Sequence, residues 1–239
     1  MTQNIYENLV IPEKYSLISI SKDEAEYIHF FLKEKNIKKT LEIGLAFGCS
    51  AAHIISATES RHYAIDPFQE KFKNLGLKNL KNLGFDKYLT FKNDFSYNIL
   101  PQFLDDGMKF DFIFIDGDHK FDFAFVDFFF ADLLLNQGSY ILFHDSWMPA
   151  LQSISSWIKT NRKDYSLVKT PQANLILFQK NSRDDRPWDH FEDFYTSKPR
   201  IRKFLHKIIH KKKRVNFFKT EKSCSKKAQG GLKTEKIKR

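Results

Sequence analysis

Few cysteines and no long apolar run limit what this chain of 239 residues can be. Its two cysteines, Cys49 and Cys224, lie far apart and form no disulfide framework, which favours a reducing compartment. No stretch approaches the roughly 20 apolar residues of a membrane-spanning helix. Residues 1–13 lack a basic end followed by an apolar run, so they do not predict a signal peptide. These absences predict a cytoplasmic protein.

Basic residues are gathered at the end of the chain, which has a formal net charge of +10. Residues 198–239 contain 17 lysine and arginine residues and two glutamates, whereas residues 1–197 contain 22 basic and 27 acidic residues. Within the basic segment, apolar residues recur at the spacing of one helical face. They are Ile201, Phe204, Leu205, Ile208 and Ile209. We therefore predict a basic amphipathic helix at about 199–215, followed by a disordered end.

This basic segment has three candidate roles. Its apolar face could pack on the preceding domain. It could instead bind an anionic membrane surface, since each nearby lysine or arginine contributes about 1 kcal/mol and the apolar face adds burial. The protein would then be peripheral at the membrane. Binding to nucleic acid is the third role and the least favoured.

Apolar residues make up 42% of the chain, enough for one substantial core with extensions. We divide the chain into an N-terminal leader and helix (1–37), a core (38–182) and a basic extension (183–239). Within the core, short apolar runs alternate with helical stretches, and this alternation predicts β-α-β units. The expected fold class is α/β, a Rossmann-like, doubly wound sheet of seven mostly parallel strands with helices on both faces.

Three expected helices carry specific predictions. Ser21 and Glu24 have the spacing of a capping box, which predicts a helix start. Residues 68–83 contain partly periodic apolar residues before Gly84, which predicts one continuous helix. Residues 121–135 are apolar almost all round but too short to cross a bilayer. That helix is therefore either covered by the fold, the favoured interpretation, or part of a homodimer contact.

The stretch from Thr40 to Ala52 has the pattern of a strand, a tight turn and a helix start. Gly44 and Gly48 allow positive φ and a close approach of backbone to a ligand, and the helix start presents free N–H groups. Such a turn predicts a nucleotide-like cofactor. A dinucleotide fingerprint would need a third glycine in the order Gly-x-Gly-x-x-Gly, so NAD is disfavoured.

The sequence of residues 41–51, Leu-Glu-Ile-Gly-Leu-Ala-Phe-Gly-Cys-Ser-Ala, resembles the first motif of class I S-adenosylmethionine-dependent methyltransferases. It is most similar to the catechol O-methyltransferase-like group. The resemblance implies S-adenosyl-L-methionine as the cofactor. It also implies that Glu42 lies near the methionine amino group, that the backbone of residues 44–48 lines the cofactor and that Ser50 meets the methionine carboxylate.

Two more acidic residues follow expected strands. Asp66 ends the second expected strand (residues 62–66), roughly 20 residues beyond the glycine turn, where a carboxylate can accept hydrogen bonds from two ribose hydroxyls. The alternative is that Asp66 caps the segment that begins at Pro67. Asp94 falls where the resembling family makes its adenine contacts, so we count it among the cofactor-binding candidates.

The fourth expected strand (residues 110–116) and the fifth (residues 139–145) also end in acidic residues, Asp116 and Asp145. The carboxyl ends of parallel strands meet at one edge of a sheet, and carboxylate oxygens suit Mg²⁺ or Mn²⁺. The pair resembles the metal ligands of the catechol O-methyltransferase-like group, with His144 and Ser146 as further candidate ligands. Ser146 stands where that group has an asparagine, so the need for a metal stays open.

His119 follows in the segment Asp116-Gly-Asp-His119, at the place of the basic lysine in the resembling group. An imidazole titrates near neutrality and can accept a proton directly, which predicts His119 and Asp116 as catalytic residues. Asp116 also lies near the cofactor by the same resemblance. The alternative is that Asp116 caps a helix and His119 bonds a backbone carbonyl. With His144-Asp145, this segment is more similar to a bacterial branch associated with methylation of sugars and other secondary metabolites.

We therefore expect an S-adenosylmethionine-dependent O-methyltransferase that acts on a hydroxyl of a small molecule, a sugar or a glycan. An RNA methyltransferase guided by the basic segment is an alternative. Against it, the chain has no Asn/Asp-Pro-Pro-Tyr segment for amino-group methylation, and neither cysteine is placed to attack a base. A non-catalytic cofactor-binding protein, recruited to a partner through its tail, is the remaining alternative.

Overall fold

A computed structural model describes residues 5–16 and 18–196 of the chain. The chain divides into two units, Met1–Tyr195 and Thr196–Arg239. The helix predicted at about 199–215 and the end that follows it lie outside the described residues. The domain boundaries predicted from the sequence stay predictions. Among the helices of the described part, none is long and apolar enough to cross a membrane.

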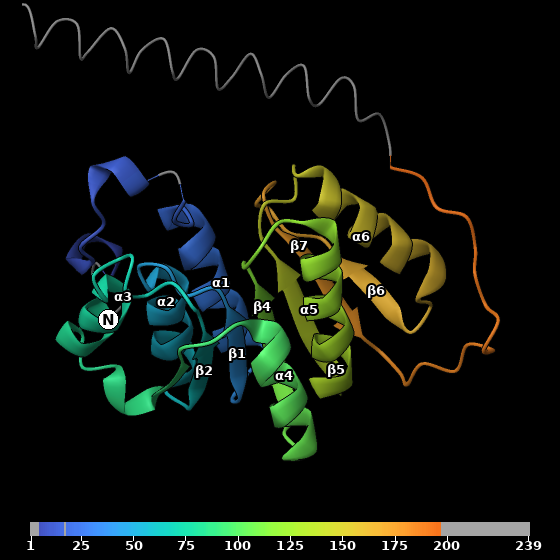
Figure 1. Ribbon diagram of the computed structural model, residues 1–239, viewed down its shortest axis with the longest axis horizontal. Coiled ribbons are helices and arrows are strands. Elements are labelled where there is room, and N and C mark those ends of the chain that lie inside the picture. Colours follow the sequence, from blue (N-terminus) through green and yellow to red (C-terminus); the bar gives the residue numbers. More distant parts are fainter. Residues whose placement is uncertain (1–4, 17, 197–239) are drawn as a thin grey trace, which may run out of the picture. The chain divides into compact units, whose positions relative to one another are not determined.

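Seven strands form one sheet in the order β3-β2-β1-β4-β5-β7-β6, which confirms the predicted fold class (Figure 1). Strands β1 to β5 are parallel to their neighbours among themselves, and β7 is antiparallel to both β5 and β6. The strand order reverses between β1 and β4, and ligand sites form at the carboxyl ends of strands at such a point. The strands are β1 (Thr40–Ile43), β2 (His62–Ile65), β3 (Leu89–Lys92), β4 (Phe110–Ile115), β5 (Leu135–Phe143), β6 (Tyr165–Val168) and β7 (Ile176–Lys180).

Helices cover both faces of the sheet (Figure 1). Helices α1, α2 and α3 pack on the face that carries Phe112 and Phe114, whereas α4, α5 and α6 pack on the face that carries Ile113 and Ile115. Alternate residues of β4 therefore enter opposite cores, as expected for a strand buried on both faces. The helices are α1 (Lys22–Glu34), α2 (Cys49–Thr58), α3 (Leu75–Asn82), α4 (Ser96–Asp105), α5 (Phe121–Leu134) and α6 (Pro149–Asn161).

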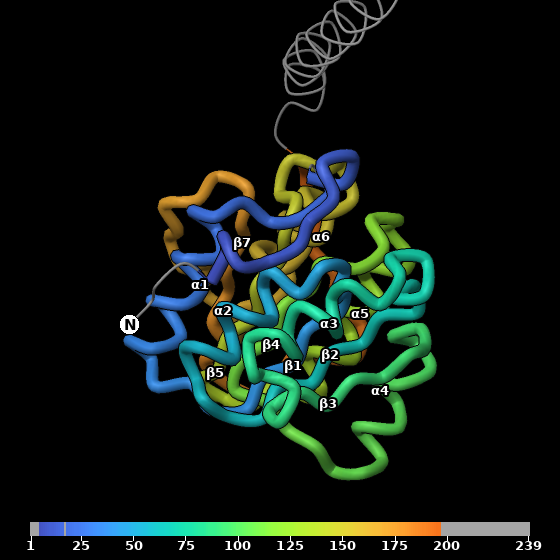
Figure 2. Tube along the Cα trace, turned by 90° about the vertical axis from the view of Figure 1, so that its left-hand side faces the viewer, coloured from blue at the N-terminus to red at the C-terminus, as the bar shows by residue number. Residues whose placement is uncertain are grey.

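The sequence before α1, residues 5–20 without residue 17, forms a leader that runs along the outside of the fold (dark blue in Figure 2). It contains two short 3₁₀ helices, Tyr6–Asn8 and Glu13–Tyr15. The predicted capping box is confirmed, because the Ser21 hydroxyl accepts from the Glu24 N–H while the Glu24 carboxylate accepts from the Ser21 N–H. This cap fixes where the leader ends and α1 begins.

The single helix predicted over residues 68–83 is wrong in its first half. Turns follow Asp66, and α3 begins only at Leu75. Lys73 and Asn74 have φ angles of 55° and 56°, a left-handed conformation that an α-helix cannot contain. The Gln69 amide donates hydrogen bonds to the Ala46 carbonyl and the Asp66 carboxylate. Residues 68–74 therefore form turns that contact the glycine turn, and they do not form the start of a helix.

Helix α5 is covered on one side only. Ala124, Phe128 and Ala131 are fully buried in the core. Phe121 and Phe129, in contrast, have exposed fractions of 46% and 53%. The fold therefore covers the face of α5 that carries Phe128, as expected. A homodimer contact through the exposed side of α5 stays a prediction.

Candidate functional site

A pocket of about 410 Å³ lies at the carboxyl ends of β1, β2 and β4. The glycine turn, the segment after β2, the start of α4 and the loops after β4 and β5 all contribute to its walls. Five of the candidate residues line it together, namely Gly44, Asp66, Asp116, His119 and Asp145. The turn expected to hold a cofactor and the acids expected to hold a metal therefore share one cavity.

The glycine turn is held in a conformation that requires glycine at Gly44. Gly44 has a φ of 97°, and a Cβ there would overlap the carbonyl group of Asp116. The Asp116 N–H in turn donates to the Ile43 carbonyl at 2.9 Å. Gly48, with a φ of 75°, precedes α2 and lies against Gly76 of α3. The missing side chain at Gly44 thus lets the turn after β1 touch the loop after β4.

Asp66 joins the end of β2 to the glycine turn. Its Oδ2 accepts hydrogen bonds from the Ala46 N–H at 2.8 Å, from the Leu45 N–H at 3.2 Å and from the Gln69 amide at 2.9 Å. Its Oδ1 accepts from the Phe68 N–H at 2.7 Å. The carboxylate is 4% exposed and still lines the pocket. Because Oδ1 accepts one bond and a carboxylate oxygen has two lone pairs, this atom can accept another donor.

Glu42 and Ser50 meet beneath the glycine turn. The Ser50 hydroxyl donates to Glu42 Oε1, and Glu42 Oε2 lies 3.3 Å from His62 Nε2. Glu42 is fully buried, and this burial raises the pKa of its carboxyl, against the opposing effect of His62 and Ser50. Neither Glu42 nor Ser50 lines the pocket. Their predicted contacts with the methionine part of a cofactor stay predictions.

Asp94 lies just before α4 and does not line the pocket. Its Oδ1 accepts from the Phe95 N–H at 2.7 Å and from the Asn98 amide at 2.9 Å. Hydrogen bonds from Asn98 and from the Phe95 N–H lower the pKa of the Asp94 carboxyl. Phe95 and Ser96 from the same segment line the pocket instead. The adenine contact assigned to Asp94 stays a prediction.

Two carboxylates and two imidazoles meet where β4 and β5 end. His119 Nε2 lies 3.0 Å from Asp145 Oδ2 and 3.7 Å from Asp116 Oδ1. His144 Nδ1 lies 3.2 Å from Asp116 Oδ1 and 3.6 Å from Asp145 Oδ2. Asp145 has a φ of 53°, which turns the chain sharply after His144. Neighbouring strand ends thus bring together the four residues that the sequence places in two motifs.

The carboxylates strongly favour the protonated form of both imidazoles. The close carboxylates of Asp116 and Asp145 raise the pKa of His119 to about 9, although burial opposes the shift. Burial also lowers the pKa of His144, but the close carboxylates of Asp116, Asp145 and Glu24 outweigh it and raise the pKa to about 12. The sequence predicts a histidine that titrates near neutrality, and the two carboxylates move His119 away from that range.

The cluster has the donor set of a divalent cation site. Ligand atoms of Asp116, His144 and Asp145 all lie within 4.8 Å of one another. Although His119 Nε2 and His144 Nδ1 are close to carboxylates, neither buried atom has a hydrogen bond of regular geometry. A cation between the carboxylates would supply the partner that His144 Nδ1 lacks. Ser146 does not join the cluster, because its hydroxyl donates to the Ala173 carbonyl at 2.6 Å.

Sequence reasoning missed two residues behind this cluster. His144 Nε2 lies 3.5 Å from Glu24 Oε2 and 3.0 Å from the Asn174 side-chain nitrogen. Burial raises the pKa of the Glu24 carboxyl, but bonds with His144 and Ser21 outweigh this and lower it to about 2. Glu24 was visible in the sequence only as part of a helix cap. Its second role depends on a contact across 120 positions of the chain.

Asp127 was also missed as a pocket residue. It interrupts the apolar sequence of α5, and its side chain lines the pocket although only 2% of the residue is exposed. Burial raises the pKa of its carboxyl to about 6, and a hydrogen bond with Ser96 opposes the shift. An acid inside an otherwise apolar helix was the signal that could have singled it out.

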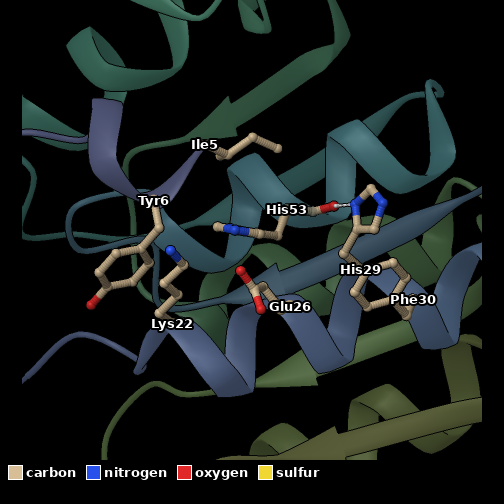
Figure 3. Close-up of a pocket in the computed structure, with 7 residues that line it drawn as sticks. All are labelled: Ile5, Tyr6, Lys22, Glu26, His29, Phe30 and His53. Atoms are coloured by element: carbon tan, nitrogen blue, oxygen red, sulfur yellow. Dashed lines mark hydrogen bonds between the residues drawn. The ribbon is translucent and has the colours of Figure 1, made fainter. Parts of the chain in front are cut away.

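A second, separate pocket of about 250 Å³ lies between α1, α2 and the leader (Figure 3). His29 and His53 line it and are both almost fully buried. His29 Nδ1 lies 3.3 Å from the His53 carbonyl oxygen, the contact drawn as a dashed line in Figure 3. No residue is common to the linings of this pocket and of the one at the glycine turn.

Residues 41–146 match a protein family described as a methyltransferase domain. The matched segment covers less than half of the chain. It holds the glycine turn, Asp66 and the whole carboxylate–imidazole cluster. The match confirms the resemblance of the glycine turn to class I S-adenosylmethionine-dependent methyltransferases.

Among curated relatives, the chain is similar over part of its length to caffeoyl-CoA O-methyltransferase 2 from Populus trichocarpa. The two are 30% identical over 112 residues, 45% of each chain. A flavonoid 3',5'-methyltransferase from Vitis vinifera is 29% identical over 110 residues, which cover 45% of this chain and 46% of the relative. The matched region is thus less than half of the length of these relatives.

Solved structures extend the similarity of fold beyond residues 41–146. The O-methyltransferase TomG from Streptomyces achromogenes, in complex with SAM, has a TM-score of 0.64 at 15% identity, over 76% of this chain and 91% of its own. An O-methyltransferase from Bacillus cereus, in complex with SAH, has a TM-score of 0.61 at 17% identity, over 74% and 87%. At such low identity these similarities establish the fold alone.

Proposed function

We propose that this protein is an S-adenosylmethionine-dependent O-methyltransferase that methylates a hydroxyl of a small molecule or glycan. The observation that carries the proposal is the shared pocket, which is lined by Gly44 of the glycine turn and Asp66 together with Asp116, His119 and Asp145. The matching family supports methyl transfer, and the name of the Populus trichocarpa relative supports oxygen as the acceptor atom.

The proposed reaction is a single displacement. The acceptor oxygen attacks the methyl carbon of the sulfonium, the carbon–sulfur bond breaks, and the hydroxyl proton leaves to a base. The products are a methyl ether, S-adenosylhomocysteine and a proton. Because the sulfonium is already a good leaving group, the protein has to align the acceptor and promote loss of its proton.

Asp66 and the glycine turn would hold the nucleoside. Asp66 Oδ1 can accept a ribose hydroxyl, while Oδ2 stays bonded to the turn. The side chains of Glu42 and Ser50, which are hydrogen-bonded to each other, would contact the methionine part of the cofactor. The backbone of the glycine turn would line the same part.

Asp116, His144 and Asp145 would hold a divalent cation. Two carboxylates suit Mg²⁺ or Mn²⁺, and an imidazole ligand is more usual for transition metals. When bound, such an ion lowers the pKa of a hydroxyl that it contacts. With a cation on Asp116 and Asp145, His119 would lose the interactions that raise its pKa. His119 Nε2 would then be able to accept the acceptor proton near neutral pH.

Calorimetry and a methyl-transfer screen test the proposal. We expect the purified protein to bind S-adenosylmethionine and to methylate members of a panel of catechols and sugars, more rapidly with Mg²⁺ or Mn²⁺. Asp116→Ala and His119→Ala are expected to bind S-adenosylhomocysteine but to lose transfer by about 100-fold or more. Asp122→Asn, at an exposed position in the first turn of α5, is the control. Unchanged turnover in both alanine variants would contradict the assigned chemistry.

The same methyl-transfer screen, extended to RNA, distinguishes the alternative functions. Methylation of RNA but of no small molecule would favour an RNA methyltransferase guided by the basic segment 198–239. Binding without transfer to any acceptor would favour a non-catalytic protein. Sedimentation with liposomes of different anionic lipid content tests the proposed membrane contact. If the amount of protein that sediments does not depend on the anionic lipid content, the contact is excluded.

A further inference from the structure

Asn79 of α3 connects two segments that are far from it in sequence. Its Oδ1 accepts from the Val10 N–H at 3.0 Å, and its Nδ2 donates to the Val10 carbonyl at 3.1 Å. Nδ2 also donates to the Phe47 carbonyl in the glycine turn at 2.9 Å. The residue is only 1% exposed. One buried amide thus bonds the leader and the glycine turn together.

Aromatic packing joins the same parts of the chain. The Tyr15 ring of the leader lies 5.5 Å from the Phe47 ring and 5.7 Å from the Phe72 ring, measured between centroids. The rings of Phe47 and Phe72 are 5.0 Å apart. Phe72 also lines the pocket at the glycine turn. The leader, the glycine turn and the pocket wall therefore pack against one another through these three rings.

The leader itself reaches the pocket. Ile18 is one of the lining residues, and half of it is exposed. A ligand that fills the cavity would cover part of this exposed apolar side chain. Ligand binding therefore gains apolar burial from the leader only when the leader is docked.

The conformation of the glycine turn depends on the groups that surround it. Ala46 has a φ of 43°, which is unfavourable for a residue with a Cβ. The Ala46 carbonyl accepts from Gln69, and the next carbonyl, that of Phe47, accepts from Asn79. Because Asn79 also bonds Val10, a change at the leader can alter the support of the turn.

We propose that the leader is a cofactor-retaining strap and that Asn79 is the positioning residue that fastens it to the glycine turn. Docking of the leader and binding of the cofactor then stabilise each other, by the same factor in both directions. The inference rests on the proposed function only in taking S-adenosylmethionine, or its product S-adenosylhomocysteine, as the ligand of the pocket.

The full chain with Val10→Pro tests the strap. Proline removes the N–H that donates to Asn79 and leaves the bond from Asn79 to Phe47 in place. Val10 is 54% exposed, and the preceding Leu9 has a ψ of 135°, which a following proline accepts. Val10→Thr, which keeps the N–H, is the matched control. Calorimetry measures the affinity for S-adenosylhomocysteine, and amide hydrogen exchange follows residues 6–20 with and without it.

We expect S-adenosylhomocysteine to slow exchange in the leader of the wild type and of Val10→Thr. Val10→Pro should bind about 3- to 10-fold more weakly, as for one lost hydrogen bond, with less protection of the leader. The strap proposal would be wrong if Val10→Pro and Val10→Thr bound S-adenosylhomocysteine with equal affinity, or if the ligand left the exchange rates of the leader unchanged. Either result would leave the proposed function intact. Failure of the wild type to bind S-adenosylhomocysteine would overturn both.

Discussion

Nε2 of His119 lies 3.0 Å from Oδ2 of Asp145, although the two residues follow different strands. The distance is short enough for an ion pair, and the nearby Asp116 strengthens the same charge state of the imidazole. The ion pair therefore occupies both the proposed base, His119, and a candidate metal ligand, Asp145. Occupation of the carboxylates by a cation would release the imidazole for proton transfer.

Asp145→Asn is expected to weaken the response of methyl transfer to a divalent cation. The substitution takes one negative charge from a site with two carboxylates, so the apparent affinity for Mn²⁺ should fall by at least about 10-fold. The affinity for S-adenosylhomocysteine should stay within about twofold of the wild type. Titration of turnover with Mn²⁺ in both proteins checks this, with Asp122→Asn as control. A wild-type response to Mn²⁺ in Asp145→Asn would place the metal elsewhere.

Gly44→Ala is expected to destabilise the fold much more than Gly107→Ala. Both glycines have positive φ, 97° and 65°, so both substitutions carry a backbone cost of about 1–2 kcal/mol. At Gly44 the new Cβ would also overlap the Asp116 carbonyl, whereas at Gly107 nothing lies within 4 Å. Urea unfolding gives both free energies. Equal losses would mean that the close contact between the two loops is not maintained in solution.

The free energy of unfolding should fall with pH below about 6.5 because of His29 and His53. Burial lowers the pKa of both imidazoles. Below the unfolded-state value of about 6.5 the unfolded chain therefore binds protons that the folded chain does not, at up to about 1.4 kcal/mol per pH unit for each histidine. Urea unfolding at pH 7.5 and 5.5 measures the effect. The double variant His29→Gln and His53→Gln should show a smaller loss at pH 5.5, and an identical loss would refute the prediction.

Asp127→Asn is expected to stabilise the protein at pH 8 but not at pH 4. The pKa of the folded-state carboxyl is raised to about 6 from an ordinary value of 3.8, so the folded chain holds the proton more tightly between these pH values. Stability from this group is present at low pH and is lost as the pH rises through 6, by about 3 kcal/mol. Asparagine never ionises and avoids this loss. Denaturant unfolding of both proteins at the two pH values is the check, and no gain at pH 8 would contradict it.

The sequence by itself determined the order of strands and helices, the glycine turn, and the acids at strand ends. These depend on local periodicity and on residue types such as Gly44, whose positive φ follows from short-range sterics. Local pattern failed at Lys73 and Asn74, where contacts between Gln69 and the glycine turn prevailed over helical spacing.

Only the tertiary structure decided which of these residues meet. The order of strands in the sheet places β4 between β1 and β5, and no local pattern encodes that order. It brings the Asp116 backbone against Gly44 and the Asp116 side chain against His144. Pairings such as Glu24 with His144, or Asn79 with Val10, join parts of the chain that are 120 and 69 residues apart. Such contacts form because the packed core fixes their distance, and the residues alone do not predict them.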